Sequence, residues 1–243
     1  MSALKPLLGI TMGDATGCGP EIIVKSLTET AFYDLSRPVV IGDAKIMERA
    51  AKIVGGAVKI RKIADVREAG NAVGVIDVLD LDNLPSDLPF AKVDARAGKA
   101  AYEYVAKGVE LAMRNEIDAI VTAPLNKEAM NLGGYHYAGH TEILGALSGT
   151  KDYAMMLVGG PLRVIHVSTH VSLREACNRT KKARVLKVIE LADESCKLLG
   201  LAEPRVAVAG LNPHAGEGGL FGTEEIEEII PAIDAAKSRG INV

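Results

Sequence analysis

Segments with strand-like and helix-like patterns alternate along almost the whole chain, and this alternation restricts the fold more than any other feature. The apolar runs at residues 7–12 and 38–43 are short enough for buried strands, and each is followed by a segment with helical apolar spacing. The longest helix is expected over about 98–115. Alternation of this kind predicts an α/β fold with a largely parallel sheet.

The second half of the chain has its own boundary signals. Two strands joined through residues 159–161 predict a hairpin, and another strand is expected over 205–211. The spacing of Ser172 and Glu175 matches a capping box, which predicts the start of a helix. We place a domain boundary within 120–126, so that residues 1–125 form a first domain and residues 126–243 a second.

Composition excludes several classes of protein. The chain has 243 residues and a formal net charge of −3, which does not indicate a nucleic-acid binder. Three cysteines without paired spacing indicate reduced thiols and a cytoplasmic protein. Asp14 interrupts the N-terminal apolar run, and no other stretch approaches the length of a membrane span. We therefore expect neither a nucleic acid nor a membrane as partner.

His166 and His170 have an i, i+4 spacing, but the residues around them favour a strand. On a strand these positions lie roughly 13 Å apart, since the rise is about 3.3 Å per residue. Metal–nitrogen bonds are only about 2 Å long, so at most one of the two histidines binds a given ion. His170, expected at the carboxyl end of the strand, is the better ligand, whereas His166 in mid-strand is more simply a packed histidine.

His214 lies in the glycine-rich stretch "NPHAGEGG", after the strand expected over 205–211. Ligands of open α/β sheets bind at the carboxyl ends of strands, so His170 and His214 are expected to converge on one ion. The stretch "YAGHTE" places His140 and Thr141 at the start of a helix, where an anionic phosphate or carboxylate is favoured. The alternative is that Thr141 merely caps that helix.

Five segments together resemble the PdxA family of metal-dependent, NAD-linked dehydrogenases. They are "ITMGDATGCGPEI" (10–22), "VTAPLNKEAM" (121–130), "GHTEIL" (139–144), "VSTHVSLREA" (167–176) and "GLNPHAGEGGLFG" (210–222), in the family's order. The resemblance implies an isocitrate/isopropylmalate dehydrogenase-like fold, in which two α/β domains are separated by a cleft. It also implies that the family's C-terminal part, with a third metal histidine, is absent from this chain.

The same resemblance implies the site residues. His170 and His214 correspond to metal ligands, and His140 and Thr141 correspond to substrate contacts. The implied cofactors are NAD and a divalent metal (Zn, Mg, Mn or Co), and the implied assembly is a homodimer. No catalytic or cofactor-binding residue is assigned. Asp14, Lys127 and Glu217 lie in matching motifs but receive no role.

The activity implied is oxidation, with decarboxylation, of a 4-phosphorylated four-carbon hydroxy acid such as D-threonate or D-erythronate 4-phosphate. The first alternative is the dehydrogenation of 4-hydroxythreonine 4-phosphate in pyridoxal phosphate biosynthesis. A relative acting on cyclic dihydrodiols fits less well, because "GHTE" suits a phosphorylated open-chain substrate better. An alternative of another class is an inactive chain that keeps only the scaffold.

Overall fold

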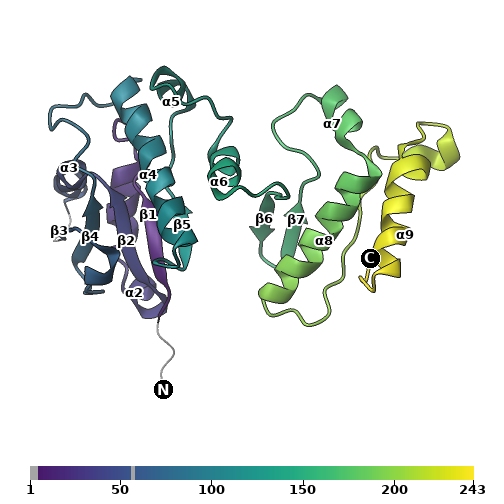
Figure 1. Ribbon diagram of the computed structural model, residues 1–243, viewed down its shortest axis with the longest axis horizontal. Helices are drawn as coiled ribbons and strands as arrows, with labels where there is room; N and C mark the ends of the chain where they lie inside the picture. The colour runs from purple at the N-terminus through teal and green to yellow at the C-terminus, as the bar shows by residue number, and fades with distance from the viewer. Residues whose placement is uncertain (1–4, 56–57) are drawn as a thin grey trace. The chain divides into compact units, whose positions relative to one another are not determined.

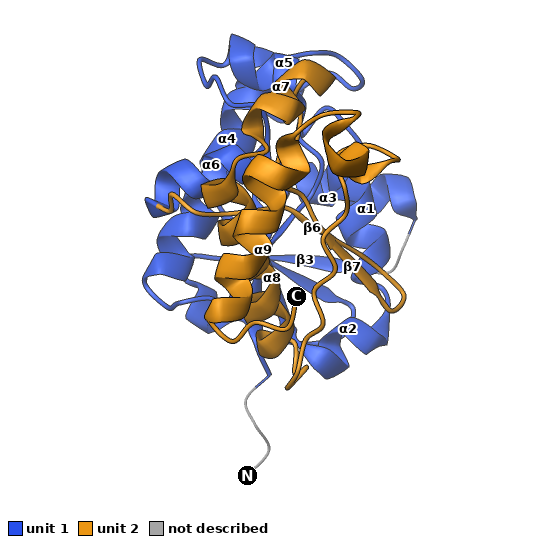
Figure 2. Cartoon of the chain, turned by 90° about the vertical axis from the view of Figure 1, so that its right-hand side faces the viewer, with its two compact units in different colours: residues 1–149 blue, residues 150–243 orange. Residues whose placement is uncertain are grey.

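The computed structural model describes residues 5–55 and 58–243 (Figure 1). The chain divides into two compact units, residues 1–149 and 150–243 (Figure 2). The boundary falls later than the 125/126 position expected from the sequence. The reason is that α5 (Lys127–Leu132) and α6 (His140–Ser148) both pack on α4 (Ala95–Met113), so they belong to unit 1.

Unit 1 contains a parallel sheet. Its strands are β1 (Leu7–Thr11), β2 (Arg37–Gly42), β3 (Lys59–Ile63), β4 (Val75–Asp80) and β5 (Ala119–Thr122). Within the described part of the chain the sheet has five strands in the order β3-β4-β2-β1-β5, and every neighbouring pair is parallel. The predicted parallel α/β sheet is therefore confirmed for this unit, and all its strands end at one edge.

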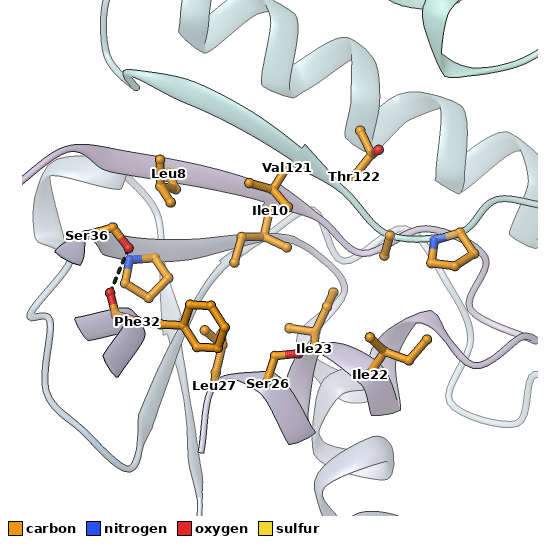
Figure 3. Close-up of a pocket in the computed structure, with 13 residues that line it drawn as sticks. Leu8, Ile10, Ile22, Ile23, Ser26, Leu27, Phe32, Ser36, Val121 and Thr122 are labelled. Carbon is orange, nitrogen blue, oxygen red and sulfur yellow. Dashed lines mark hydrogen bonds between the residues drawn. The ribbon is translucent and has the colours of Figure 1, made fainter. Parts of the chain in front are cut away.

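Helices cover both faces of this sheet. They are α1 (Gly19–Ser26), α2 (Thr30–Leu35), α3 (Ala44–Val54) and α4, with a short 3₁₀ turn at Val66–Glu68. Along β1 the side chains alternate in burial: Thr11 is buried beneath α4, whereas Leu8 and Ile10 point to the opposite face. Leu8 and Ile10 share that face with residues of α1 (Figure 3). This two-sided cover is what a parallel sheet requires.

The backbones of α4 and α5 touch at Gly98. A Cβ atom built on Gly98 would lie 2.0 Å from the carbonyl carbon and oxygen of Ala129, so only glycine fits there. Gly108 of the same helix has room for a Cβ atom, which would meet Thr11 Cγ2 at 3.5 Å, an ordinary van der Waals distance. The Gly98 contact seats α5, and with it the segment that leads to α6.

Unit 2 combines a hairpin with helices. The expected hairpin is confirmed as β6 (Met156–Gly159) paired antiparallel with β7 (Leu162–Ile165). The helices are α7 (Leu173–Arg179), α8 (Lys182–Leu198) and α9 (Ile230–Ser238). Ser172 Oγ accepts the backbone N–H of Glu175 at 3.2 Å, which confirms the predicted N-cap. The core of this unit lies between α8 and α9.

The prediction of a strand over residues 205–211 is wrong. The structure assigns no strand to those residues, although the Val206 N–H donates to the carbonyl of Asn242 at 2.9 Å. Val206 and Val208 still pack against the α8–α9 core. Alternating apolar residues therefore bury one side of an extended segment, but a strand also needs a neighbouring strand to complete its hydrogen bonds.

Two histidine positions also differ from expectation. The β7 strand ends at Ile165, so His166 follows the strand instead of lying within it. His170 is farther along the loop to α7 and has a left-handed backbone (φ 56°). The distance argued from strand rise therefore does not apply to this pair. His214 likewise follows an extended segment and not a strand.

The last helical segment of the chain begins with a wider turn. Residues Glu225–Ile229 form a π-helix (η3), in which the Ile230 N–H donates to the carbonyl of Glu225. Pro231 has no N–H to donate, so the ordinary α-helical bond at that position is lost. The π turn precedes this proline, and α9 continues from Ile230.

Bilayer crossing demands a long, strongly apolar helix, and none occurs among residues 5–55 and 58–243.

We predict that G98A and G108A change stability in opposite directions. G98A forces α5 away from α4 and should lower the free energy of unfolding by about 1–3 kcal/mol. G108A reduces the backbone freedom of the unfolded chain and should raise the free energy of unfolding by roughly 0.5–1 kcal/mol. Chemical denaturation of both variants measures the difference. Equal effects would contradict the backbone contact described above.

Candidate functional site

The first group of predicted site residues, His140 and Thr141, lies in unit 1 and follows β5 along the chain. The turn after β5 is joined to the turn after β1, because the Asp14 N–H donates to the carbonyl of Pro124 at 2.9 Å. Asp14 is buried, and its carboxylate accepts the Thr16 backbone N–H at 2.9 Å. Asp14 thus has a structural role in closing its own turn.

His140 and Thr141 are the first two residues of α6. The N-cap position is Gly139, and no side chain caps this helix. Thr141 is therefore inside the helix and does not cap it, which removes the alternative reading of this residue. The uncapped N-terminus carries backbone N–H donors and the positive end of the helix dipole, both of which favour an anion.

The surroundings of His140 favour the neutral form of its imidazole. Its Nε2 atom is buried and has no hydrogen-bond partner among the described residues. Burial lowers the pKa of His140 below its ordinary value of 6.5. A buried ring nitrogen without a partner is costly, so its position is consistent with a polar ligand that completes it.

Lys127 is a cation beside the same helix end, and it was given no role from the sequence. A Cβ atom built on Gly139 would lie 3.9 Å from Lys127 Cε and 3.6 Å from Glu142 Oε2, so the lysine stem and a carboxylate both lie beside the N-terminus of α6. Lys127 forms no salt bridge within the part of the chain that the structure describes. Its motif "VTAPLNKEAM" drew attention to it without assigning a role, and only the three-dimensional arrangement places it beside the start of α6.

Three tyrosines support the segment between α5 and α6. The rings of Tyr102 on α4 and Tyr135 are stacked with centroids 3.7 Å apart, and the ring of Tyr137 lies 5.8 Å from Tyr102. Stacking on a long helix fixes the chain just before α6 begins. It thereby restricts where His140 and Thr141 lie.

The second group of predicted residues lies in unit 2. His214 is exposed, and its Nδ1 is 3.3 Å from Glu217 Oε2. The ring also lies against Phe221, with centroids 4.8 Å apart. A carboxylate at Nδ1 favours the tautomer with the proton on that nitrogen, which leaves Nε2 free for another ligand. The i, i+3 spacing of His214 and Glu217 in the sequence was a usable signal for this pair.

His170 and His214 lie in loops that border one pocket of unit 2. This pocket of about 210 Å³ is lined by Ser168, two residues before His170, and by Gly210 and Leu211, shortly before His214. The two loops therefore start from the same part of the unit. However, no cluster of three potential metal ligands from His, Cys, Asp and Glu is found among residues 5–55 and 58–243.

The imidazole nitrogens of these two histidines are suitable metal ligands, but two ligands are too few for a complete metal site. Both side chains are exposed, and His214 has the carboxylate partner typical of metal-binding histidines. Metal sites in enzymes usually have three protein ligands. A divalent ion held by His170 and His214 would need a further donor besides these two.

An apolar pocket of about 270 Å³ in unit 1 contains none of the predicted site residues. It lies between β1, β5 and α1, where Leu8, Ile10 and Val121 face Ile23 and Leu27 (Figure 3). None of the described residues lining it is ionisable, so it offers no group for acid–base chemistry or metal binding.

Comparison with known proteins connects this arrangement to a family. The family model described as "Pyridoxal phosphate biosynthetic protein PdxA" matches residues 34–243, which include all four predicted site residues. The chain belongs to the PdxA family. The α/β fold with a parallel central sheet agrees with the structures of this family.

Three PdxA relatives with high similarity are named dehydrogenases. A D-threonate 4-phosphate dehydrogenase of Cupriavidus necator is 49% identical over 244 residues, which cover 100% of this chain and 73% of the relative. The crystal structure of a 4-hydroxythreonine-4-phosphate dehydrogenase from Burkholderia phymatum has 51% identity and a TM-score of 0.88, over 98% of this chain and 73% of that one. The corresponding enzyme of Klebsiella pneumoniae has 42% identity and a TM-score of 0.89, over 100% and 74%.

The lowered pKa of His140 gives a prediction about pH. Below the ordinary histidine pKa of about 6.5 the unfolded chain gains a proton that the folded chain does not, so stability falls as the pH decreases. We expect the imidazole of His140 to titrate below 6.5 in histidine NMR spectra. The variant H140Q should lose less stability than the parent chain on acidification. A His140 titration midpoint above 6.5 would contradict the described burial.

Proposed function

We propose that this PdxA-family chain is a dehydrogenase of a 4-phosphorylated four-carbon hydroxy acid, with D-threonate or D-erythronate 4-phosphate as substrate. The main support is the unpartnered, buried Nε2 of His140 at the uncapped N-terminus of α6 beside Lys127. The names of the similar relatives support the same class of substrate.

Unit 1 supplies the groups that bind the anionic substrate in this proposal. The ammonium of Lys127 and the first N–H groups of α6 both attract an anion, while the Glu142 carboxylate in the first turn of α6 opposes part of that attraction. The hydroxyl of Thr141 and the neutral imidazole of His140 add hydrogen bonds without adding charge. The substrate carries two anionic groups, a phosphate and a carboxylate, and either fits this set of donors.

Unit 2 supplies His170 and His214 as ligands of a divalent ion. Imidazole ligands suit ions such as Zn²⁺ better than Mg²⁺, which prefers oxygen. Glu217 would hold the ring of His214 by accepting the Nδ1 proton. Since two histidines are fewer than the usual three protein ligands, the proposed site requires another donor.

The overall reaction is the oxidation of a secondary alcohol next to the carbon that bears the carboxylate. When bound, the metal would polarise the alcohol oxygen, and NAD would accept the hydride. The resulting β-keto acid then loses CO₂. The residues of this chain bind and orient the acid, and no general base is assigned.

The first experiment separates the proposed activity from its alternatives. The chain is supplied with NAD, Zn²⁺ or Mn²⁺, and either D-threonate 4-phosphate or 4-hydroxythreonine 4-phosphate, and NADH formation is followed by absorbance. Faster turnover of the threonate is expected. Preference for the amino compound would favour the pyridoxal phosphate pathway, and no turnover with either substrate would favour a non-catalytic scaffold.

We predict that K127M weakens binding of D-threonate 4-phosphate by about tenfold or more. The loss corresponds to one hydrogen bond to a charged group, worth about 1.5–3 kcal/mol. T141V should weaken binding less, because it removes a neutral hydroxyl. Calorimetric titration of the ligand measures both, and K52M, at an exposed lysine of α3, is the matched control. Unchanged affinity in K127M would remove this lysine from the proposed site.

The homodimer implied by the resemblance stays a proposal. Exposed apolar side chains on the β6–β7 hairpin, among them Leu157, Val158 and Leu162, are available for contact with a second chain. Sedimentation analysis of the protein tests this directly.

A further inference from the structure

The loop that carries His214, residues 210–222, has an unfavourable backbone. Ala215 and Glu217 have left-handed φ values of 47° and 44°, which residues with a Cβ rarely adopt. Gly216 and Gly218 continue the same conformation, with φ values of 72° and 69°. Such a run persists only when surrounding contacts determine it. The contacts that hold this loop therefore also decide where His214 points.

Asn212 holds the loop from within. Its side-chain oxygen accepts the N–H of His214 at 2.9 Å and that of Gly216 at 3.4 Å. Its amide nitrogen donates to the carbonyl of Phe221 at 3.0 Å. These bonds fold the loop on itself, but they do not attach it to the rest of unit 2.

Glu225 attaches the loop to the helix that follows. This residue starts η3 and is only 6% exposed. Its Oε1 accepts the N–H of Leu211 at 2.8 Å, which fixes the point where the chain enters the loop. The chain leaves the loop at Gly222, so one carboxylate links the entrance of the loop to the helix at its exit.

The second carboxylate oxygen of Glu225, Oε2, lies against the backbone of Gly216 in the middle of the loop. A Cβ atom built on Gly216 would lie 2.8 Å from Glu225 Oε2 and 2.9 Å from the carbonyl oxygen of Gly222, both closer than a Cβ atom approaches other atoms in proteins. Oε2 is buried and has no hydrogen-bond partner among the described residues. The carboxylate thus packs against the backbone of the left-handed segment between His214 and Glu217.

We propose that Glu225 is a positioning residue for His214: by binding Leu211 and packing against Gly216, it fixes the loop that presents the imidazole. This inference rests on the proposed role of His214 as a metal ligand. It is independent of substrate binding in unit 1. Glu225 itself touches neither substrate nor metal in this scheme.

The test uses four variants of the full chain. E225A removes the carboxylate, and E225Q keeps an oxygen that can accept the Leu211 N–H. E227A is the matched control, because Glu227 lies in the same π turn but is exposed. H214A removes the proposed ligand. Zn²⁺ affinity is measured by calorimetry, and loop order is measured by the rate of chymotrypsin cleavage at the exposed Leu220 and Phe221.

We expect E225A to weaken Zn²⁺ binding about tenfold or more, as removal of groups that orient metal ligands does. H214A should weaken binding at least as much, and E225A should speed cleavage of the loop. E225Q should restore both properties, while E227A should change neither. A merely structural role predicts lower thermal stability in E225A with unchanged Zn²⁺ affinity, and that result would overturn the inference.

The outcomes also separate this inference from the proposed function. If H214A leaves Zn²⁺ affinity unchanged, the proposed metal role of His214 fails, and loop cleavage in E225A against E227A alone decides whether Glu225 orders the loop. If H214A weakens binding and E225A does not, the metal role stands and the inference is wrong.

A pair of glycine variants keeps the inference testable if E225A does not fold. G216A and G218A both place a Cβ on a left-handed residue, but only G216A brings that atom against Glu225 and the carbonyl oxygen of Gly222, since nothing lies within 4 Å of Gly218. We expect faster loop cleavage and weaker Zn²⁺ binding in G216A than in G218A. Equal effects would show that the contact with Glu225 does not position the loop.

Discussion

Parallel pairing of β1 with β2 and β5 is the constraint on which unit 1 depends. It brings the ends of these strands to one edge, so the turns that follow β1 and β5 meet and bond through Asp14 and Pro124. The chain then continues directly into α5 and α6. The close approach of α5 to Gly98 on α4 gives this segment little freedom. These contacts fix the position of the N-terminus of α6, where burial favours the neutral form of His140.

Unit 2 is stabilised by helix packing and by side-chain contacts, and not by a large sheet. Its hairpin is small, and its core consists mainly of residues between α8 and α9. The loop with His214 is not held by a sheet but by side chains, chiefly Asn212 within the loop and Glu225 below it. Loops that present functional groups commonly depend on a rigid support of this kind. Here the support is the start of the last helix.

The sequence predicted the parts of the fold that depend on local patterns. The apolar runs of β1 and β2, the hairpin turn and the Ser172 cap are all decided within a few residues, and all are present. The prediction of a strand over 205–211 was wrong. Apolar residues do alternate there, but a strand also requires hydrogen bonds to a neighbouring strand that is distant in the sequence. The compact units divide after residue 149 and not at 125/126, because the attachment of α5 and α6 to α4 is a tertiary contact that local patterns do not reveal.

The candidate site was predictable to a similar extent. The motif around His140 placed it at a helix start, and the His214 motif identified an unusual loop. The position of Lys127 against Gly139 was not predictable, because it results from the packing of α5 and α6 on a shared helix. The family resemblance supplied residue roles that the geometry by itself does not assign. The metal ligands remain predictions, since they involve two loops without a complete ligand set.

The π turn before Pro231 makes this helix sensitive to the deletion of a single residue. An α-helix advances about 100° per residue, so loss of one residue from Glu225–Ile229 would restore regular winding and rotate Glu225 by roughly that angle. The carboxylate would then turn away from Leu211, although no amino acid in the loop had changed. A single-residue deletion in this helix is therefore expected to be tolerated less well than most substitutions on its exposed face.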